Sequence, residues 1–160
     1  MEPIDLTPHS PWGMILRLLM SCLLGGSLGI QRELTRHPAG LRTHMLVALS
    51  STGLVLVGLI LLENAGENAN AELARIIQGV VTGVGFIGAG AIIREGFSIH
   101  GLTTAASLWM ACALGIIVGL DAFLLATVTA TIAIILLLLP HHEEGKKARK
   151  NDQPDEQHTR

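Results

Sequence analysis

Five long apolar segments, separated by short polar ones, dominate the pattern of this chain. They cover residues 12–31, 45–62, 76–93, 101–120 and 122–139, and each is 18–20 residues long. A helix of about 20 apolar residues is long enough to cross a bilayer. The pattern therefore predicts an all-α integral membrane protein with five transmembrane helices. Little more than Asp121 separates the last two segments, so they are expected to form a tight hairpin.

One charge interrupts the first apolar segment. Arg17 lies five residues after Trp12, which is about 7.5 Å along a helix at a rise of 1.5 Å per residue. Long cationic side chains near the end of a span can reach the headgroups while their stems stay in lipid. We therefore expect Arg17 to snorkel toward the membrane surface.

The basic residues lie almost entirely on one side of the predicted bundle. The segments after spans one, three and five carry nine of them, namely Arg32, Arg36, Arg42, Arg94, Lys146, Lys147, Arg149, Lys150 and Arg160. The other side carries only Arg75, which is close in sequence to Glu63, Glu67 and Glu72. Because Lys and Arg are enriched in cytoplasmic segments, the N-terminus is predicted to be outside and the C-terminus cytoplasmic.

Composition supports a membrane domain followed by a polar tail. The chain is 49% hydrophobic and only 15% charged, whereas about 25% charged residues is usual in soluble domains. We expect a five-helix domain at 1–139 and a disordered, charged cytoplasmic tail at 140–160. The HHEE run at 141–144 is not expected to form a closed metal site, because adjacent residues in a flexible tail seldom do. Cys22 and Cys112 are expected to be small buried hydrophobic residues.

The third span contains GVGFIG at 83–88, which matches the glycine fingerprint of dinucleotide-binding folds. That fingerprint requires a preceding strand, a soluble helix and an acidic residue about 20 positions on. Here the motif lies in an uncharged segment of membrane-span length, and Thr103 stands 20 residues after Gly83. No nucleotide is therefore implied, and no cofactor is expected.

Glycines at helical spacing predict close helix packing instead. Small residues let the backbones of membrane helices approach one another. G-x-x-x-G pairs occur in spans one, three and four, and the helix-packing glycines are Gly25, Gly29, Gly79, Gly83, Gly85, Gly88, Gly115 and Gly119. The glycine-dense third span has two explanations: tight packing at the bundle centre, or a locally opened helix around Thr82–Gly85 that lines a polar path.

Spans one and two resemble spans three and four. Gly26, Arg32 and Glu33 recur 62 positions later, and Gly40, Leu41, Thr43 and Gly58 recur 61 positions later. The pattern suggests a parallel two-helix repeat about an axis along the membrane normal. Such a repeat would bring both cytoplasmic turns together, so the candidate functional cluster on the cytoplasmic face is Arg32, Glu33, Arg42, His44, Arg94, Glu95, Thr103 and Thr104.

Four segments resemble the N-terminal membrane domain of the MgtC/SapB family and cover about two-thirds of the chain. They are GGSLGIQREL at 25–34, AGLRTHMLVALSS at 39–51, RIIQGVVTGVGFIGAGAIIREG at 75–96 and GLTTAASLWMACALGIIVG at 101–119. The resemblance implies a bacterial inner-membrane protein linked to growth under magnesium limitation, to virulence and to survival inside macrophages. It also implies a regulator that restrains the ATP synthase and binds small membrane peptides. Many members continue into an ACT-like domain, so this chain is expected to be a short form.

Two functions remain open at this stage. The G-x-x-x-G pairs favour a regulator that contacts other membrane proteins or further copies of itself within the lipid bilayer. A transporter or channel for magnesium or another cation is the alternative, although the span centres lack the carboxylates that magnesium prefers. No nucleophile–base pair or metal-ligand cluster stands out, so neither an enzyme, a metal site nor nucleic-acid binding is expected.

Overall fold

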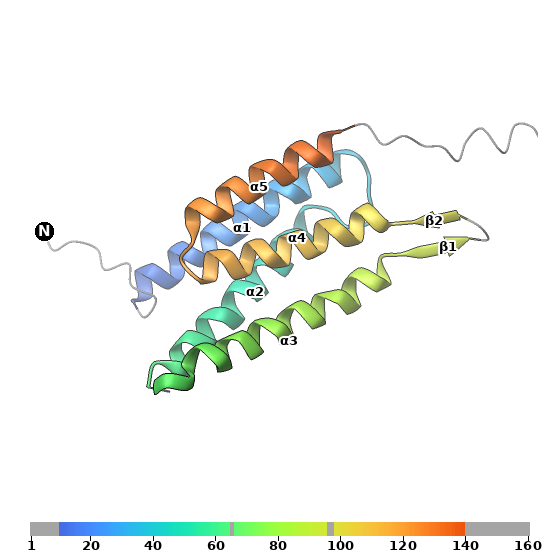
Figure 1. The fold of residues 1–160 in the computed structure, drawn as a ribbon. Coiled ribbons are helices and arrows are strands. Elements are labelled where there is room, and N and C mark those ends of the chain that lie inside the picture. Colours follow the sequence, from blue (N-terminus) through green and yellow to red (C-terminus); the bar gives the residue numbers. More distant parts are fainter. Residues whose placement is uncertain (1–9, 65, 96–97, 140–160) are drawn as a thin grey trace, which may run out of the picture.

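Five helices form most of the structure, a computed structural model (Figure 1). It describes residues 10–64, 66–95 and 98–139, and of residues 93–95 and 98 it describes only the main chain. The helices are α1 (Pro11–Leu34), α2 (Leu41–Leu62), α3 (Ala69–Gly90), α4 (Leu102–Gly119) and α5 (Phe123–Leu138). A short 3-10 helix, η1 (Gly66–Asn68), precedes α3. The prediction of five helices is confirmed.

Local chemistry explains where α1 begins. The Ser10 hydroxyl accepts a hydrogen bond from the N–H of Gly13 at 3.0 Å, and Pro11 occupies the first helical position. Serine is a favoured N-cap, and proline suits the first position because the N–H it lacks would have no helical partner. The helix therefore begins one residue before the apolar segment that predicts it.

The connection between α3 and α4 differs from the sequence prediction. Span three is predicted to reach Ile93, but α3 ends at Gly90. Two short strands follow, β1 (Ile93–Glu95) and β2 (Ser98–His100), and they pair in antiparallel register. The helical bundle thus carries a β-hairpin at one end. Gly101 then turns the chain into α4 with a left-handed φ of 86°, a conformation that glycine adopts without strain.

Helices α1, α2 and α4 form the centre of the bundle (Figure 1). α5 packs on α1 and α4, whereas α3 packs on α2 and α4 from the other side. In the most apolar 18-residue stretch of each span, 56% of the residues are buried in Leu102–Gly119, but only 11% are buried in Gly66–Gly90, which includes α3. The expectation that the third span packs tightly at the centre is therefore wrong. It was based on the density of glycines in this span, which does not show where a helix lies in the bundle.

The core is aliphatic and contains small residues. One cluster joins α1, α4 and α5 through Leu28, Leu114, Ala130 and Ala133. A second joins α2, α3 and α4 through Val55, Val84, Cys112 and Ile116. Alanine at the contact faces of α5 allows that helix to approach α1 and α4 closely, although it has no G-x-x-x-G pair.

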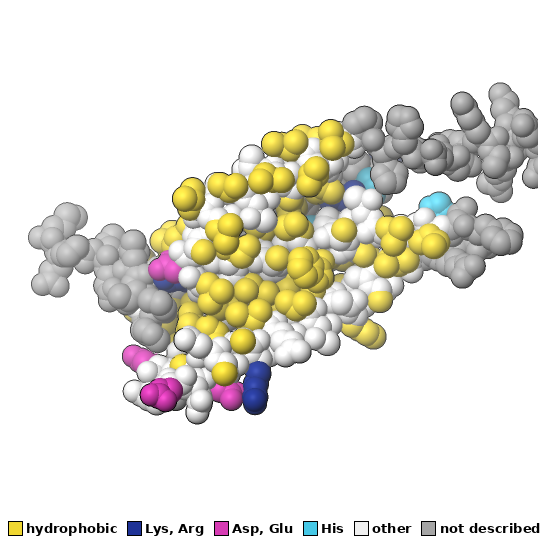
Figure 2. Space-filling view, viewed as in Figure 1, with side chains coloured by type: hydrophobic (Ala, Val, Ile, Leu, Met, Phe, Trp, Pro, Cys, Tyr) yellow, Lys and Arg dark blue, Asp and Glu magenta, His cyan; other side chains and the backbone are white. Residues whose placement is uncertain are grey.

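The outer surface has the character of a membrane protein. Hydrophobic side chains cover much of the face shown in Figure 2, and acidic side chains gather at one end. Four segments have the length and hydropathy of membrane spans: Pro11–Leu34, Leu41–Leu62, Gly66–Gly90 and Leu102–Gly119. α5 is apolar but has 16 residues, about 24 Å at 1.5 Å per residue. Its full crossing of the bilayer stays a prediction.

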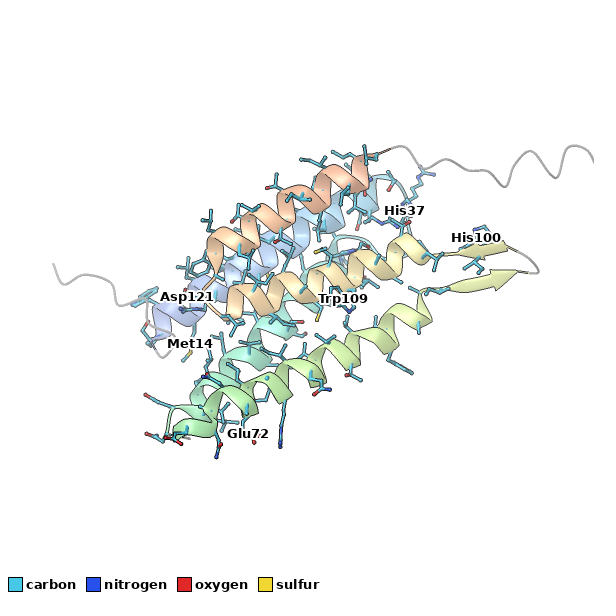
Figure 3. The ribbon with its side chains drawn as sticks, viewed as in Figure 1. Met14, His37, Glu72, His100, Trp109 and Asp121 are labelled. Carbon is cyan, nitrogen blue, oxygen red and sulfur yellow. The ribbon has the colours of Figure 1, made fainter. Side chains whose placement is uncertain are left out.

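The connections between the helices lie at two opposite ends of the bundle. The segment after α1, the β-hairpin and the end of α5 lie at one end (Figure 1). The start of α1 and the α2–α3 and α4–α5 connections lie at the other. We call the first the hairpin end and the second the Asp121 end, because Asp121 lies in the α4–α5 turn (Figure 3).

The orientation of the two ends gives a first prediction. Because nine of the eleven Lys and Arg residues lie at the hairpin end or after α5 in the sequence, a reporter fused after Arg160 should be cytoplasmic. A reporter inserted near Asn68, at the Asp121 end, should be external. Paired enzymatic reporters that are active on only one side of the membrane would measure both positions. The opposite pattern would invert the orientation and place the hairpin end outside.

Candidate functional site

A buried polar cluster joins α1, α2 and α4 at the hairpin end. Arg32, in the last turn of α1, donates from Nη2 to the Thr104 hydroxyl in the first turn of α4 at 2.7 Å. His44 of α2 bonds the Gly40 carbonyl through Nδ1 at 2.8 Å and the Ser107 hydroxyl through Nε2 at 3.0 Å. All four of Arg32, His44, Thr104 and Ser107 are buried. The hydrogen bonds of this cluster therefore link α1 and α2 to the N-terminal part of α4.

The polar contacts between α2 and α4 continue toward the middle of the bundle. The Ser51 hydroxyl donates to the sulfur of Cys112 at 3.2 Å. One turn of α4 further, the Thr52 hydroxyl donates to the Gly115 carbonyl at 2.7 Å. Cys112 is buried, as the sequence predicts, whereas Cys22 is only half-buried. These short side chains satisfy their hydroxyl groups inside the bundle, where an unpaired polar group would be costly.

The structure brings together only part of the predicted cytoplasmic cluster. Arg32, His44 and Thr104 meet, as described above. Glu33 is exposed, and its carboxylate accepts a hydrogen bond from the N–H of Leu41 at 2.7 Å. Arg42 is exposed and Thr103 is half-buried. Arg94 and Glu95 lie in β1, and their side chains are outside the described part of the structure.

Sequence reasoning missed Ser107, the second partner of His44. A signal was present, because Thr104, Ser107, Ala111 and Gly115 follow at helical spacing and place small residues on one face of α4. The interpretation of this helix concentrated on its G-x-x-x-G pair and did not consider hydroxyl groups on the same face. The described residues contain no group of three His, Cys, Asp or Glu side chains that could hold a metal ion.

Arg17 does not snorkel. Its side chain is 1% exposed, and its guanidinium lies 2.9 Å from the carboxylate of Asp121. It also lies 5.9 Å from the centre of the Phe123 ring, within the range of a cation–π interaction. The prediction is wrong because Asp121 is distant in sequence, and only the return of α5 beside α1 brings the carboxylate to the arginine.

Four of the predicted packing glycines lie at close helix crossings. A Cβ on Gly25 would lie 2.6 Å from Ala48 Cβ, and one on Gly29 would lie 2.7 Å from Leu41 Cα. A Cβ on Gly115 would overlap the Ala48 carbonyl oxygen, and one on Gly119 would lie 2.8 Å from Val55 Cβ. Gly88 makes only ordinary contact with Ala105. The close contacts therefore join α2 to α1 on one side and to α4 on the other.

The glycines of α3 behave differently. Apart from the adjacent residues and the nearby backbone of α3 itself, no atom lies within 4 Å of a Cβ added at Gly79, Gly83 or Gly85. For these three residues, packing within the bundle is a wrong expectation. An opened helix is also wrong, because α3 is continuous and the Thr82 hydroxyl donates to the Gln78 carbonyl at 2.8 Å. GVGFIG thus lies inside a helix and not between a strand and a helix.

Gly79 and Gly83 instead line an open, mostly apolar groove of about 570 Å³ between α2 and α3. Its walls are formed by Leu46, Val47, Ser50, Ser51, Leu54, Ile76, Val80, Val84, Ile87 and Cys112. Gly85 is not part of the lining. The groove exists because glycine leaves space on α3 where a larger side chain would fill it.

Long apolar helices, an apolar exterior and buried interhelical polar contacts define a small multi-pass membrane protein. A family model described as the MgtC family matches residues 18–144. The chain belongs to the MgtC family.

Individual relatives agree with this assignment. The Protein MgtC of Salmonella typhimurium LT2 is 38% identical over 144 residues, which cover 83% of this chain and 59% of the relative. Protein SrpB of Synechococcus elongatus is 38% identical over 70% of this chain and 66% of its own length. "Putative magnesium transporter YhiD" of Escherichia coli K12 is 33% identical over 86% of this chain and 65% of its own. The chain thus spans roughly three-fifths of the curated relatives it matches. No solved structure matches it significantly.

Proposed function

We propose that this protein is a regulator in the bacterial inner membrane that acts through helix contacts with other membrane proteins, the ATP synthase among them. In this proposal it supports growth under magnesium limitation and virulence, including survival inside macrophages. The groove between α2 and α3 carries the proposal. Membrane helices associate through van der Waals packing where small residues allow close approach. Gly79 and Gly83 offer such a surface, and the bundle itself does not use it.

The position of α3 supports the same role. α3 lies at the edge of the bundle and contacts α2 and α4 on one side only. Its opposite face carries exposed Gln78 and Thr82. A partner helix that occupied the groove would bury its apolar walls. Its backbone would pack closely against Gly79 and Gly83, which have no side chain to hold it away.

Cation transport is the second candidate, favoured by the printed name of the Escherichia coli relative. Magnesium is usually bound by carboxylates and waters. Among the described residues, the carboxylates nearest the spans lie at their ends, at Glu33, Glu63, Glu67, Glu72 and Asp121. The interior polar groups described above are hydroxyls, an imidazole and arginines. This chemistry fits a transport path for magnesium less well than it fits interhelical contacts.

The groove gives a second prediction. Gly83→Leu should reduce co-purification of the ATP synthase with the full chain from native membranes, because the new side chain fills the groove. Overpacking a close interface costs about 1–3 kcal/mol, which corresponds to roughly 5- to 150-fold weaker binding. The thermal stability of the purified protein should not fall, because no atom outside the adjacent part of α3 lies within 4 Å of the added Cβ.

Gly85→Leu is the matched control, since Gly85 is on the same helix, is equally open and does not line the groove. It should retain the partner. Equal loss in both variants, or no loss in Gly83→Leu, would contradict the groove as the contact surface. Saturable magnesium flux in proteoliposomes that hold this protein alone, reduced by Gln78→Ala or Thr82→Val, would favour the transporter instead.

A further inference from the structure

Arg32 is a buried cation that forms no ion pair with a carboxylate among the described side chains. Its side chain is 3% exposed, and its Nε is buried and has no hydrogen-bond partner. No ion pair joins Arg32 to any carboxylate in the part of the chain that the structure describes. Its neighbour in sequence, Glu33, points to the N–H of Leu41 instead. The guanidinium has one hydrogen bond, to the Thr104 hydroxyl. Burial of a charge is costly unless an opposite charge or several hydrogen bonds offset it.

The other buried arginine shows how this fold balances such a charge. Arg17, at the Asp121 end, has a carboxylate at 2.9 Å. At the hairpin end, Arg32 lies in the last turn of α1, where the helix dipole favours a cation. That dipole is equivalent to only about half an elementary charge. It therefore compensates the guanidinium incompletely.

The N-terminus of α4, at the same place, has no anionic partner among the described side chains either. The first N–H groups of α4 follow Gly101, and no described side chain caps them. The equivalent N-terminus of α2 follows Gly40, and there Glu33 accepts from the first N–H. The N-terminus of a helix carries partial positive charge and free N–H donors, which suits an anion. Arg32 reaches this N-terminus directly, through Thr104 in its first turn.

We propose that Arg32 and the N-terminus of α4 form a binding site for a phosphate group. One oxyanion placed there would balance the buried guanidinium and accept hydrogen bonds from the uncapped N–H groups. Thr103, half-buried in the same turn, adds a hydroxyl donor. A guanidinium combined with a helix N-terminus is a recurrent arrangement for phosphate recognition.

The location indicates where the phosphate comes from. The site lies at the hairpin end of the bundle, where α1 ends and where α2 and α4 begin (Figure 1). The ends of helices that cross a bilayer lie close to its headgroups. Lipid headgroups carry phosphate at that depth, and free phosphate can reach the same end from water. Both sources present the same oxyanion to Arg32. The site is at a different place from the α2–α3 groove and does not depend on the function proposed for it.

The test uses the full chain and two sources of phosphate. The protein in a neutral detergent is titrated with inorganic phosphate against sodium chloride of equal ionic strength, and its melting temperature is followed. In parallel, it is placed in nanodiscs of phosphatidylcholine with and without phosphatidylglycerol, and retained lipid is identified by native mass spectrometry. We expect a saturable rise in melting temperature, or retained phosphatidylglycerol, in at least one arm. The arm that responds identifies the source.

Arg32→Gln should weaken this binding about tenfold or more, since it removes a charged hydrogen-bonding partner. Arg42→Gln is the matched control, because Arg42 is exposed at the same end and the variant has the same net charge. It should bind as the wild type does. If Arg32→Gln does not fold, Arg32→Lys retains the charge without the planar set of donors, and should bind more weakly than the wild type. The proposal is overturned if the wild type responds in neither arm, if the Arg32 variants bind like the wild type, or if Arg42→Gln loses as much as Arg32→Gln.

Discussion

Gly115→Ala is expected to destabilise the bundle, even though the change adds a single methyl group. The added Cβ would overlap the carbonyl oxygen of Ala48 and lie 2.8 Å from Cβ of Ser51. Both atoms belong to the part of α2 that crosses α4, so α2 and α4 must move apart. That movement also lengthens the 2.7 Å hydrogen bond from Thr52 to the Gly115 carbonyl. Overpacking costs about 1–3 kcal/mol, and the net loss of one hydrogen bond adds about 0.5–1.5 kcal/mol.

Gly83→Ala is the matched comparison. It places the same methyl group on a glycine that has no neighbour within 4 Å. Alanine is a better helix former than glycine by about 1 kcal/mol, so this variant should be as stable as the wild type or slightly more so. Unfolding of both variants in mixed micelles, with increasing denaturing detergent, measures the difference. Equal stability of the two variants would show that the crossing of α2 and α4 is not as close as the structure has it.

The contrast between these glycines marks what sequence spacing could and could not predict. G-x-x-x-G spacing is the same in α3 and α4, at Gly79 and Gly83 and at Gly115 and Gly119. In α4 the glycines meet the backbone or side chains of α2, whereas in α3 they line an open groove. The spacing shows that one face of a helix has no side chains at two successive turns and can approach another helix closely. It does not show whether the chain's own helices cover that face, because this depends on the position of the helix in the bundle.

The hydropathy of the sequence was sufficient to predict the five helices. An apolar segment of span length has few alternatives to a helix in lipid, because each backbone polar group must be satisfied within the segment. The hairpin of β1 and β2 was not predicted, since six residues with mixed polarity give too short a pattern to identify strands. It begins at Ile93, the residue at which the third apolar segment was expected to end.

The polar cluster at the hairpin end was predicted only in part. Repeated Arg-Glu and Gly-Leu-x-Thr motifs indicated that Arg32, His44 and Thr104 would be close, and the structure brings these three together. The sequence could not show which carboxylate pairs with which arginine. Glu33 adjoins Arg32 in sequence but caps α2, while Asp121 reaches Arg17 across the bundle. Such pairings depend on the three-dimensional arrangement of helix ends.

The pair of Arg17 and Asp121 gives the last prediction. Asp121→Asn should lower the free energy of unfolding by about 1–3 kcal/mol, less than the 3–5 kcal/mol typical of a fully buried pair, because Asp121 is 51% exposed. Asparagine is the right replacement because Asp121 has a left-handed φ of 68°, which asparagine tolerates. The destabilisation therefore reports the lost charge and not a strained turn.

A double variant separates the ion pair from other effects of the same residues. Arg17→Met removes the buried charge and keeps much of the apolar volume beside α5. Replacement of a buried ion pair by apolar residues is often neutral or stabilising. Arg17→Met combined with Asp121→Asn should consequently be more stable than Asp121→Asn alone, when unfolding is measured in the same mixed micelles. If the two changes simply add, the pair does not couple α1 to the α4–α5 turn, and the burial of Arg17 needs another explanation.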